Sequence, residues 1–148
     1  MRKFLLPIIN LVNLILVSVA WGLSNQTAVI DVGQTVSDIP CGTLYDITWM
    51  GASANWIAII AFFLFIFGCA AILVAFLPMK ARKFVSCAAG VMLVAAGVLF
   101  FLSLKTYDRY IVTPEFTGAF IALNVLILCA GAFSLCMSAI EFFQKKAK

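Results

Sequence analysis

The feature that most constrains this chain is an uninterrupted apolar run at residues 56–77. The run, WIAIIAFFLFIFGCAAILVAFL, contains no charged residue, and Pro78 and a short basic segment follow it. A helix of this length crosses a bilayer core of roughly 30 Å at about 1.5 Å per residue. A helix that is apolar on every side belongs in lipid or in the centre of a large core. Because 148 residues cannot build a core that large, we expect a membrane protein.

The composition supports the same conclusion. Hydrophobic residues make up 65% of the chain and charged residues 11%, whereas a soluble domain has about 45–50% apolar and about 25% charged residues. The net charge of +4 comes from basic residues clustered at the ends of apolar runs, where a bilayer interface accounts for them. The predicted partner is therefore the lipid bilayer, and nucleic acid is not expected.

Three further apolar runs are long enough to span a bilayer. We predict four membrane helices, at about residues 4–23, 54–77, 84–104 and 116–140, in a single integral membrane domain of residues 1–148. The first run begins with basic residues like a signal peptide, but its apolar part is longer than a typical signal core. Thr113, Pro114 and Glu115 favour a helix start, as N-cap, first helical residue and acidic first turn. The predicted fold is an all-α membrane protein, a four-transmembrane-helix bundle.

Basic residues are distributed unevenly between the two ends of the predicted bundle. One end carries Arg2, Lys3, Lys80, Arg82, Lys83, Lys145, Lys146 and Lys148. The other end carries only Lys105 and Arg109, and every Trp and Tyr lies at or beyond that boundary. An excess of Lys and Arg marks the cytoplasmic side, and amphipathic rings mark an interface. We therefore expect a protein of the cell membrane with both termini in the cytoplasm.

The first outer loop, residues 24–53, is the longest segment outside the predicted helices. Residues 27–32 and 43–49 have β-branched character, so a small sheet in this extracellular loop is expected. The loop contains Asp31, Asp38 and Asp46 but no Lys or Arg. These acids form either a solvated surface or a contact site for a cation or a basic partner.

The five cysteines do not form a recognisable metal or redox motif. Four of them lie within predicted spans, and only Cys41 lies in an outer loop. The chain has no His and no C-x-x-C, so zinc, heme and dithiol sites lack their usual ligands, and no cofactor or metal is predicted. Cys41 is either an ordinary loop residue or half of a disulfide between chains.

Catalytic groups are missing from the predicted spans. Between the ends of the spans there is no Asp, Glu, Lys, Arg or His, so neither a paired general base nor a carboxylate dyad exists there. Proton-coupled transport also normally needs an ionisable residue within the membrane. We therefore expect neither an enzyme nor such a transporter.

Small residues recur along the predicted helices and allow a neighbouring helix to approach closely. On the fourth helix they form a stripe with alternating spacings of four and three: Gly118, Ala122, Val125, Cys129, Ala132, Cys136 and Ala139. We expect the partner of this stripe to be another helix of the same chain, with a second subunit as the alternative. The candidate packing residues are Gly68, Ala71, Ala75, Ala89, Gly90, Gly97, Gly118, Ala122 and Cys129.

Three amides lie within the predicted spans: Asn10 and Asn13, three residues apart on the first helix, and Asn124 on the fourth. They are either hydrogen-bonding contacts between helices or the lining of a water-filled path. The sequence therefore predicts a non-catalytic interaction or assembly component that forms oligomers with itself or another membrane protein. The alternative is a homo-oligomeric channel lined by Asn10 and Asn13.

Overall fold

A computed structural model of the protein describes residues 5–24, 30–31, 56–75, 77, 81–103, 115–116 and 118–144. These residues form four helices: α1 (Leu5–Ser24), α3 (Trp56–Val74), α4 (Arg82–Ser103) and α5 (Gly118–Gln144). They also form two short strands, β1 (Ile30–Asp31) and β2 (Glu115–Phe116). All four predicted helices are therefore present, with ends that differ from the predicted ones by a few residues.

Three apolar segments are each long enough to cross a membrane: Trp56–Val74, Arg82–Ser103 and Phe120–Phe143. In α1 the apolar stretch with described side chains is shorter, Ile8–Val19. Long apolar helices satisfy their backbone hydrogen bonds internally, which is the requirement for a segment in lipid. The described helices are therefore those of a membrane protein.

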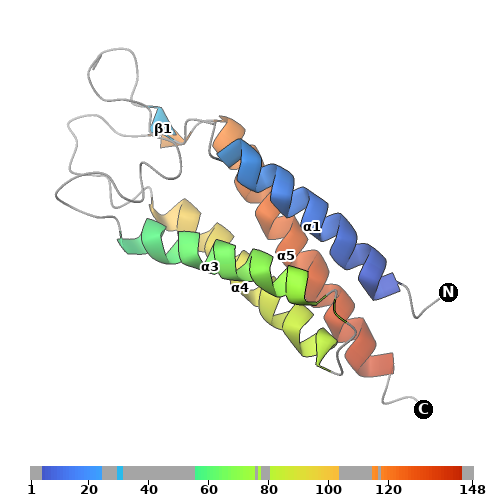
Figure 1. The fold of residues 1–148 in the computed structure, drawn as a ribbon. Helices are drawn as coiled ribbons and strands as arrows, with labels where there is room; N and C mark the ends of the chain where they lie inside the picture. The colour runs from blue at the N-terminus through green and yellow to red at the C-terminus, as the bar shows by residue number, and fades with distance from the viewer. Residues whose placement is uncertain are drawn as a thin grey trace.

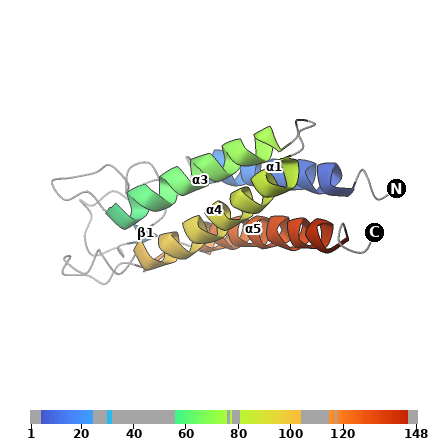
Figure 2. The ribbon, with the colours of Figure 1, turned by 90° about the horizontal axis from the view of Figure 1, so that it is seen from below.

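The four helices pack side by side as a bundle with both chain termini at one end (Figure 1). The α3 helix contacts α4, α4 contacts α5, and α1 contacts α5 and, less extensively, α3. Helices that follow one another in the sequence run in opposite directions (Figures 1 and 2). The arrangement is therefore an up-down-up-down bundle.

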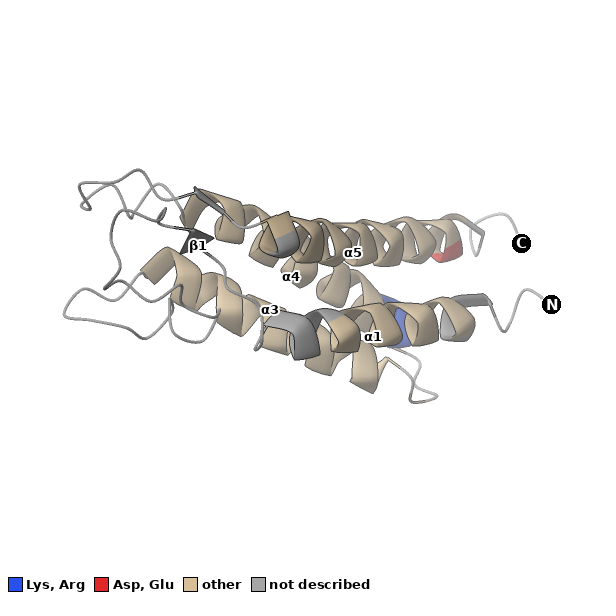
Figure 3. Ribbon diagram, turned by 90° about the horizontal axis from the view of Figure 1, so that it is seen from above, with Lys and Arg blue, Asp and Glu red and all other residues tan. Residues whose placement is uncertain are grey.

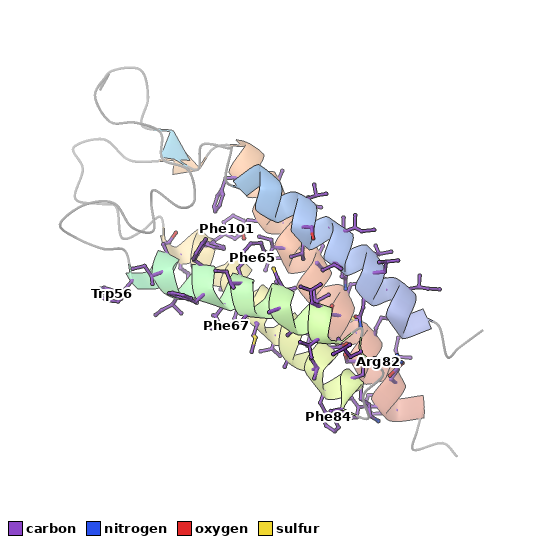
Figure 4. The ribbon with its side chains drawn as sticks, in the orientation of Figure 1. Trp56, Phe65, Phe67, Arg82, Phe84 and Phe101 are labelled. Carbon is purple, nitrogen blue, oxygen red and sulfur yellow. The ribbon has the colours of Figure 1, made fainter. Side chains whose placement is uncertain are left out.

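Large side chains fill the centre of the bundle. Phe65, Leu93 and Phe100 have no exposed surface, and the Phe100 ring meets that of Phe120 edge-on at 5.9 Å between centroids. Phe65 points into the bundle, whereas Phe67, two residues further along α3, points away and is 58% exposed (Figure 4). Bulky apolar side chains thus cover both the inside and the outside of the bundle, as lipid exposure allows.

The α3 helix ends at Val74, three residues earlier than predicted. The amide of Ala75 still donates to the Ala71 carbonyl at 2.9 Å, but that of Leu77 donates to the carbonyl of Val74 at 3.0 Å, which is a tighter turn. Pro78 follows, and a proline disfavours helical geometry in the residue before it. The apolar run therefore extends three residues beyond the end of the helix.

The start of α5 differs from the prediction and corrects it. Glu115 and Phe116 do not open the helix: they pair antiparallel with Asp31 and Ile30, respectively, and the helix begins at Gly118. Pairing between strands requires extended backbone, which excludes helical geometry at the same residues. The second predicted strand run, residues 43–49, lies outside the described residues, so a sheet within the outer loop stays a prediction.

Charged residues with described positions gather at the end of the bundle where α1 begins and α5 ends (Figure 3). Arg82 and Lys83 lie in the first turn of α4, and Glu141 lies in the last part of α5. The Nζ atom of Lys83 is 4.8 Å from the centroid of the Phe142 ring, and that ring meets Phe84 edge-on. A cation over an aromatic face ties the start of α4 to the end of α5.

Candidate functional site

Two amides of α1 reach across the bundle to two other helices. Asn10 donates from Nδ2 to Ser86 Oγ of α4 at 3.1 Å, and Asn13 donates from Nδ2 to Ser134 Oγ of α5 at 2.7 Å. Both amides are 1% exposed, so these bonds lie within the bundle. Hydrogen bonds of this kind hold helices together where the surroundings are apolar.

The register of the helices brings a third serine to the same place. Since Asn13 meets Ser134, Asn10 lies level with residues 137 and 138 of the antiparallel α5, and Ile9 packs against Met137 accordingly. On α4, Gly90 lies against Gly131 and Leu135 of α5, so Ser86, one turn earlier, lies level with the turn that contains Ser138. We call this set the polar seam: Asn10, Asn13, Ser86, Ser134 and Ser138.

The polar seam contains unsatisfied hydrogen-bonding groups. Asn10 Oδ1, Asn13 Oδ1 and Ser138 Oγ are buried, and none has a hydrogen-bond partner among the residues that the structure describes. A buried polar group without a partner costs about 1–3 kcal/mol. The seam is therefore both the polar attachment of α1 and a place where further hydrogen bonds are favourable.

Asn124 forms a separate polar contact. Its Nδ2 donates to the carbonyl oxygen of Gly97 on α4 at 2.9 Å, and the residue has no exposed surface. It lies ten residues from Ser134 along α5, or about 15 Å at 1.5 Å per residue. All three predicted amides thus face other helices of the same chain, on the inside of the bundle.

The small-residue stripe of α5 lies on the opposite face. Every member is exposed, so the expectation that the stripe packs against another helix of this chain is wrong. An added Cβ at Gly118, for instance, would meet nothing within 4 Å. The face that packs inward is Phe120, Leu123, Asn124, Ile127, Ala130, Gly131, Ser134, Met137 and Ser138. Both faces of α5 carry apolar residues at spacings of three and four. The face with the larger side chains is the one that packs into the core.

The candidate packing residues of α3 and α4 lie at contacts between helices. An added Cβ would approach Leu93 Cδ2 to 2.9 Å at Gly68, the Gly131 carbonyl oxygen to 2.9 Å at Gly90 and Leu128 Cδ2 to 2.5 Å at Gly97. Ala75 and Ala89 are buried, and Ala71 is half-buried. On α5, by contrast, Ala122 and Cys129 are exposed with the rest of the stripe.

Sequence reasoning missed one close contact and the serine partners of the amides. An added Cβ at Gly131 would lie 2.9 Å from the backbone nitrogen of Val94, so α4 and α5 touch nearly backbone to backbone there. Ser86, Ser134 and Ser138 belong to the polar seam but look like ordinary small residues in apolar runs. On α5 the only sequence signal is a hydroxyl at helical spacing on the face that Asn124 also occupies. On α4, which has no amide side chain, Ser86 has no such signal.

The outer-loop candidates are only partly described. The backbone of Asp31 pairs with Glu115 in the short sheet. Asp38, Cys41 and Asp46 lie outside the described residues.

The described candidate residues inside the bundle form contacts between helices. The described residues of the chain contain no group of three or more His, Cys, Asp or Glu side chains placed to hold a metal ion. The thiols of Cys69, Cys87, Cys129 and Cys136 are free, and the two on α5 belong to the exposed stripe. Compared with protein families, curated proteins and solved structures, the chain matches none.

Proposed function

We propose that this chain is a non-catalytic, multi-pass protein of the cell membrane that assembles with copies of itself through the stripe on α5. The observation that carries the proposal is the outward direction of this stripe. Elsewhere the outer faces carry mainly bulky groups, such as Leu11 on α1, Phe67 on α3 and Val91 on α4, and only single small residues such as Ala70 and Ala88 are exposed among them. Lipid tails pack against bulky and small side chains alike, whereas a second helix needs small ones for close approach.

The shape of this face also favours a helix as its occupant. The stripe is flanked by four exposed large side chains, Ile121, Leu126, Phe133 and Ile140. Apart from Val125, the stripe residues between them are small. Spacings of four and three suit the roughly 20° crossing of two helices. A second copy is the favoured partner because a two-fold axis places one surface against itself, so the two stripes are automatically matched in length and spacing.

Orientation in the membrane is part of the proposal. The basic residues at the end that holds the termini support a cytoplasmic location for both, as the distribution of Lys and Arg predicts. Copies inserted in the same direction would align their α5 helices in parallel. Each residue of the stripe would then lie near its own counterpart.

The two cysteines of the stripe provide the test. In a Cys41→Ser background, mild oxidation of native membranes should link Cys129 or Cys136 to its counterpart and give a covalent dimer. The double variant Cys129→Ser, Cys136→Ser should lose that dimer, and adding Val98→Cys, an exposed position on α4, should not restore it. The proposal is contradicted if the dimer persists without the two stripe cysteines, or if Val98→Cys links as readily as they do.

Reconstitution of the protein in liposomes tests the channel alternative. Asn10 and Asn13 are bonded to serines inside the bundle, which favours a role in packing over a role in lining a path between subunits. We expect no ion flux from the wild-type protein in liposomes. A clear conductance that Asn10→Leu abolishes without loss of folding would replace the assembly proposal with a channel.

A further inference from the structure

The three unsatisfied groups of the polar seam have complementary hydrogen-bonding roles. Asn10 Oδ1 and Asn13 Oδ1 are acceptors, and Ser138 Oγ is a hydroxyl that both donates and accepts. The two amides are one helical turn apart, with a rise of about 4.5 Å between them. Ser138 lies on α5 at the level of Asn10, as the contacts of Asn13 with Ser134 and of Ile9 with Met137 show.

We propose that the polar seam binds one water molecule that joins α1 to α5. The water donates its two hydrogens to Asn10 Oδ1 and Asn13 Oδ1 and accepts the hydrogen of Ser138 Oγ. Buried waters typically make about three hydrogen bonds to otherwise unsatisfied groups. A single molecule therefore satisfies all three buried groups at once.

Water fits the seam better than a cation does. The described side chains of the seam are amides and hydroxyls. The charged residues about one helical turn beyond it are two basic ones, Arg82 and Lys83, and one acidic one, Glu141. A cation would lose its hydration without gaining a net neutralising charge, which is unfavourable in an apolar interior. Water adds no charge and needs only the three polar groups that are present.

Asn124 provides an internal control. Its Oδ1 is also buried and without a partner in the described part of the chain. It lies about 15 Å from Ser134 along α5, and no other unsatisfied side-chain atom among the described residues lies at its level. Since a buried water needs two to four polar partners, we expect the surroundings of Asn124 to be dry.

Solid-state NMR of the protein in liposomes tests the proposal, with transfer of magnetisation from water to side-chain amides as the readout. With signals assigned through backbone connectivity, transfer to the amides of Asn10 and Asn13 should be several-fold faster than transfer to that of Asn124. Ser138→Ala should slow the transfer at both Asn10 and Asn13, which share the water, while the transfer at Asn124 stays unchanged. Equal transfer rates at the three amides would overturn the proposal.

Replacing choline with sodium or lithium at constant ionic strength separates water from a cation. We expect the signals of Asn10 and Asn13 to keep their positions. A shift specific to one of these ions at both amides would show that a monovalent cation occupies the seam, and would also overturn the proposal.

Discussion

At the scale of single residues, the glycines differ sharply in what an added methyl group would meet. At Gly131 the nearest atoms include the Val94 backbone nitrogen at 2.9 Å and the Gly90 carbonyl oxygen at 3.0 Å, neither of which can move alone. At Gly68 the nearest atom is Leu93 Cδ2, the end of a flexible side chain. At Gly118 the space is open. The same residue type is therefore indispensable at one position of α5 and replaceable at another.

The first prediction compares two alanine substitutions on α5. Gly131→Ala should lower the free energy of unfolding by about 1–3 kcal/mol because α4 and α5 must separate to admit the methyl group. Gly118→Ala should be neutral, since nothing lies within 4 Å of the added carbon. Unfolding by SDS titration in mild detergent measures both. Equal stability of the two variants would mean that α4 and α5 are not in backbone contact.

At the scale of elements, α1 is held differently from the other helices. The α3, α4 and α5 helices share the large core side chains Phe65, Leu93 and Phe100 together with close contacts at glycines. Among its described side chains, α1 buries Ile9 and Val17 and places two amides in the polar seam. Hydrogen bonds between membrane helices average about 0.6 kcal/mol, so this attachment is weaker than close packing.

The second prediction concerns that attachment. The double variant Asn10→Leu, Asn13→Leu should lose about 1 kcal/mol of stability, the sum of two such bonds. Hydrogen exchange of the α1 amides should accelerate, while exchange in α4 should stay as in the wild type. Exchange that accelerates equally in α1 and α4 would show that the amides stabilise the whole bundle rather than the attachment of α1.

The sequence predicts the elements better than the faces they present. Apolar length and flanking charges locate each helix, but the start of α5 depends on pairing of Glu115 with Asp31, which lies far away in the chain. The direction of the α5 stripe was predicted wrongly because lipid accepts apolar side chains as a core does, so both faces of α5 look suitable for the inside. The inward direction of Asn10 and Asn13 was predictable, because an amide is costly in lipid. Their serine partners were not, because they depend on the register between helices.

At the scale of the whole molecule, the two ends of the bundle differ. The start of α1 and the end of α5 lie at the end that carries Arg82 and Lys83, and the short sheet lies at the other (Figure 1). Trp56 begins α3 at that other end (Figure 4). Basic groups gathered at one end are typical of a protein with a fixed orientation in a membrane, and an amphipathic ring such as that of Trp56 is typical of an interface.

The third prediction tests this orientation. A membrane-impermeant thiol reagent applied to intact cells should label Cys41, provided that it is a free thiol. A cysteine introduced by Ala147→Cys, in a Cys41→Ser background, should react only after the cells are permeabilised, because we expect the terminus in the cytoplasm. Labelling of position 147 in sealed cells would reverse the proposed orientation.

The central claim is that copies of this chain assemble through the α5 stripe, and energy transfer between donor-labelled and acceptor-labelled copies in liposomes tests it most directly. On dilution with lipid, the wild-type signal should stay above the level of random encounters, and Val98→Leu, on an exposed face of α4, should behave the same. Ala132→Leu should weaken association by about 5–150-fold, since overpacking costs about 1–3 kcal/mol. A wild-type signal that falls to the random level, or an Ala132→Leu signal equal to that of wild type, would contradict the account.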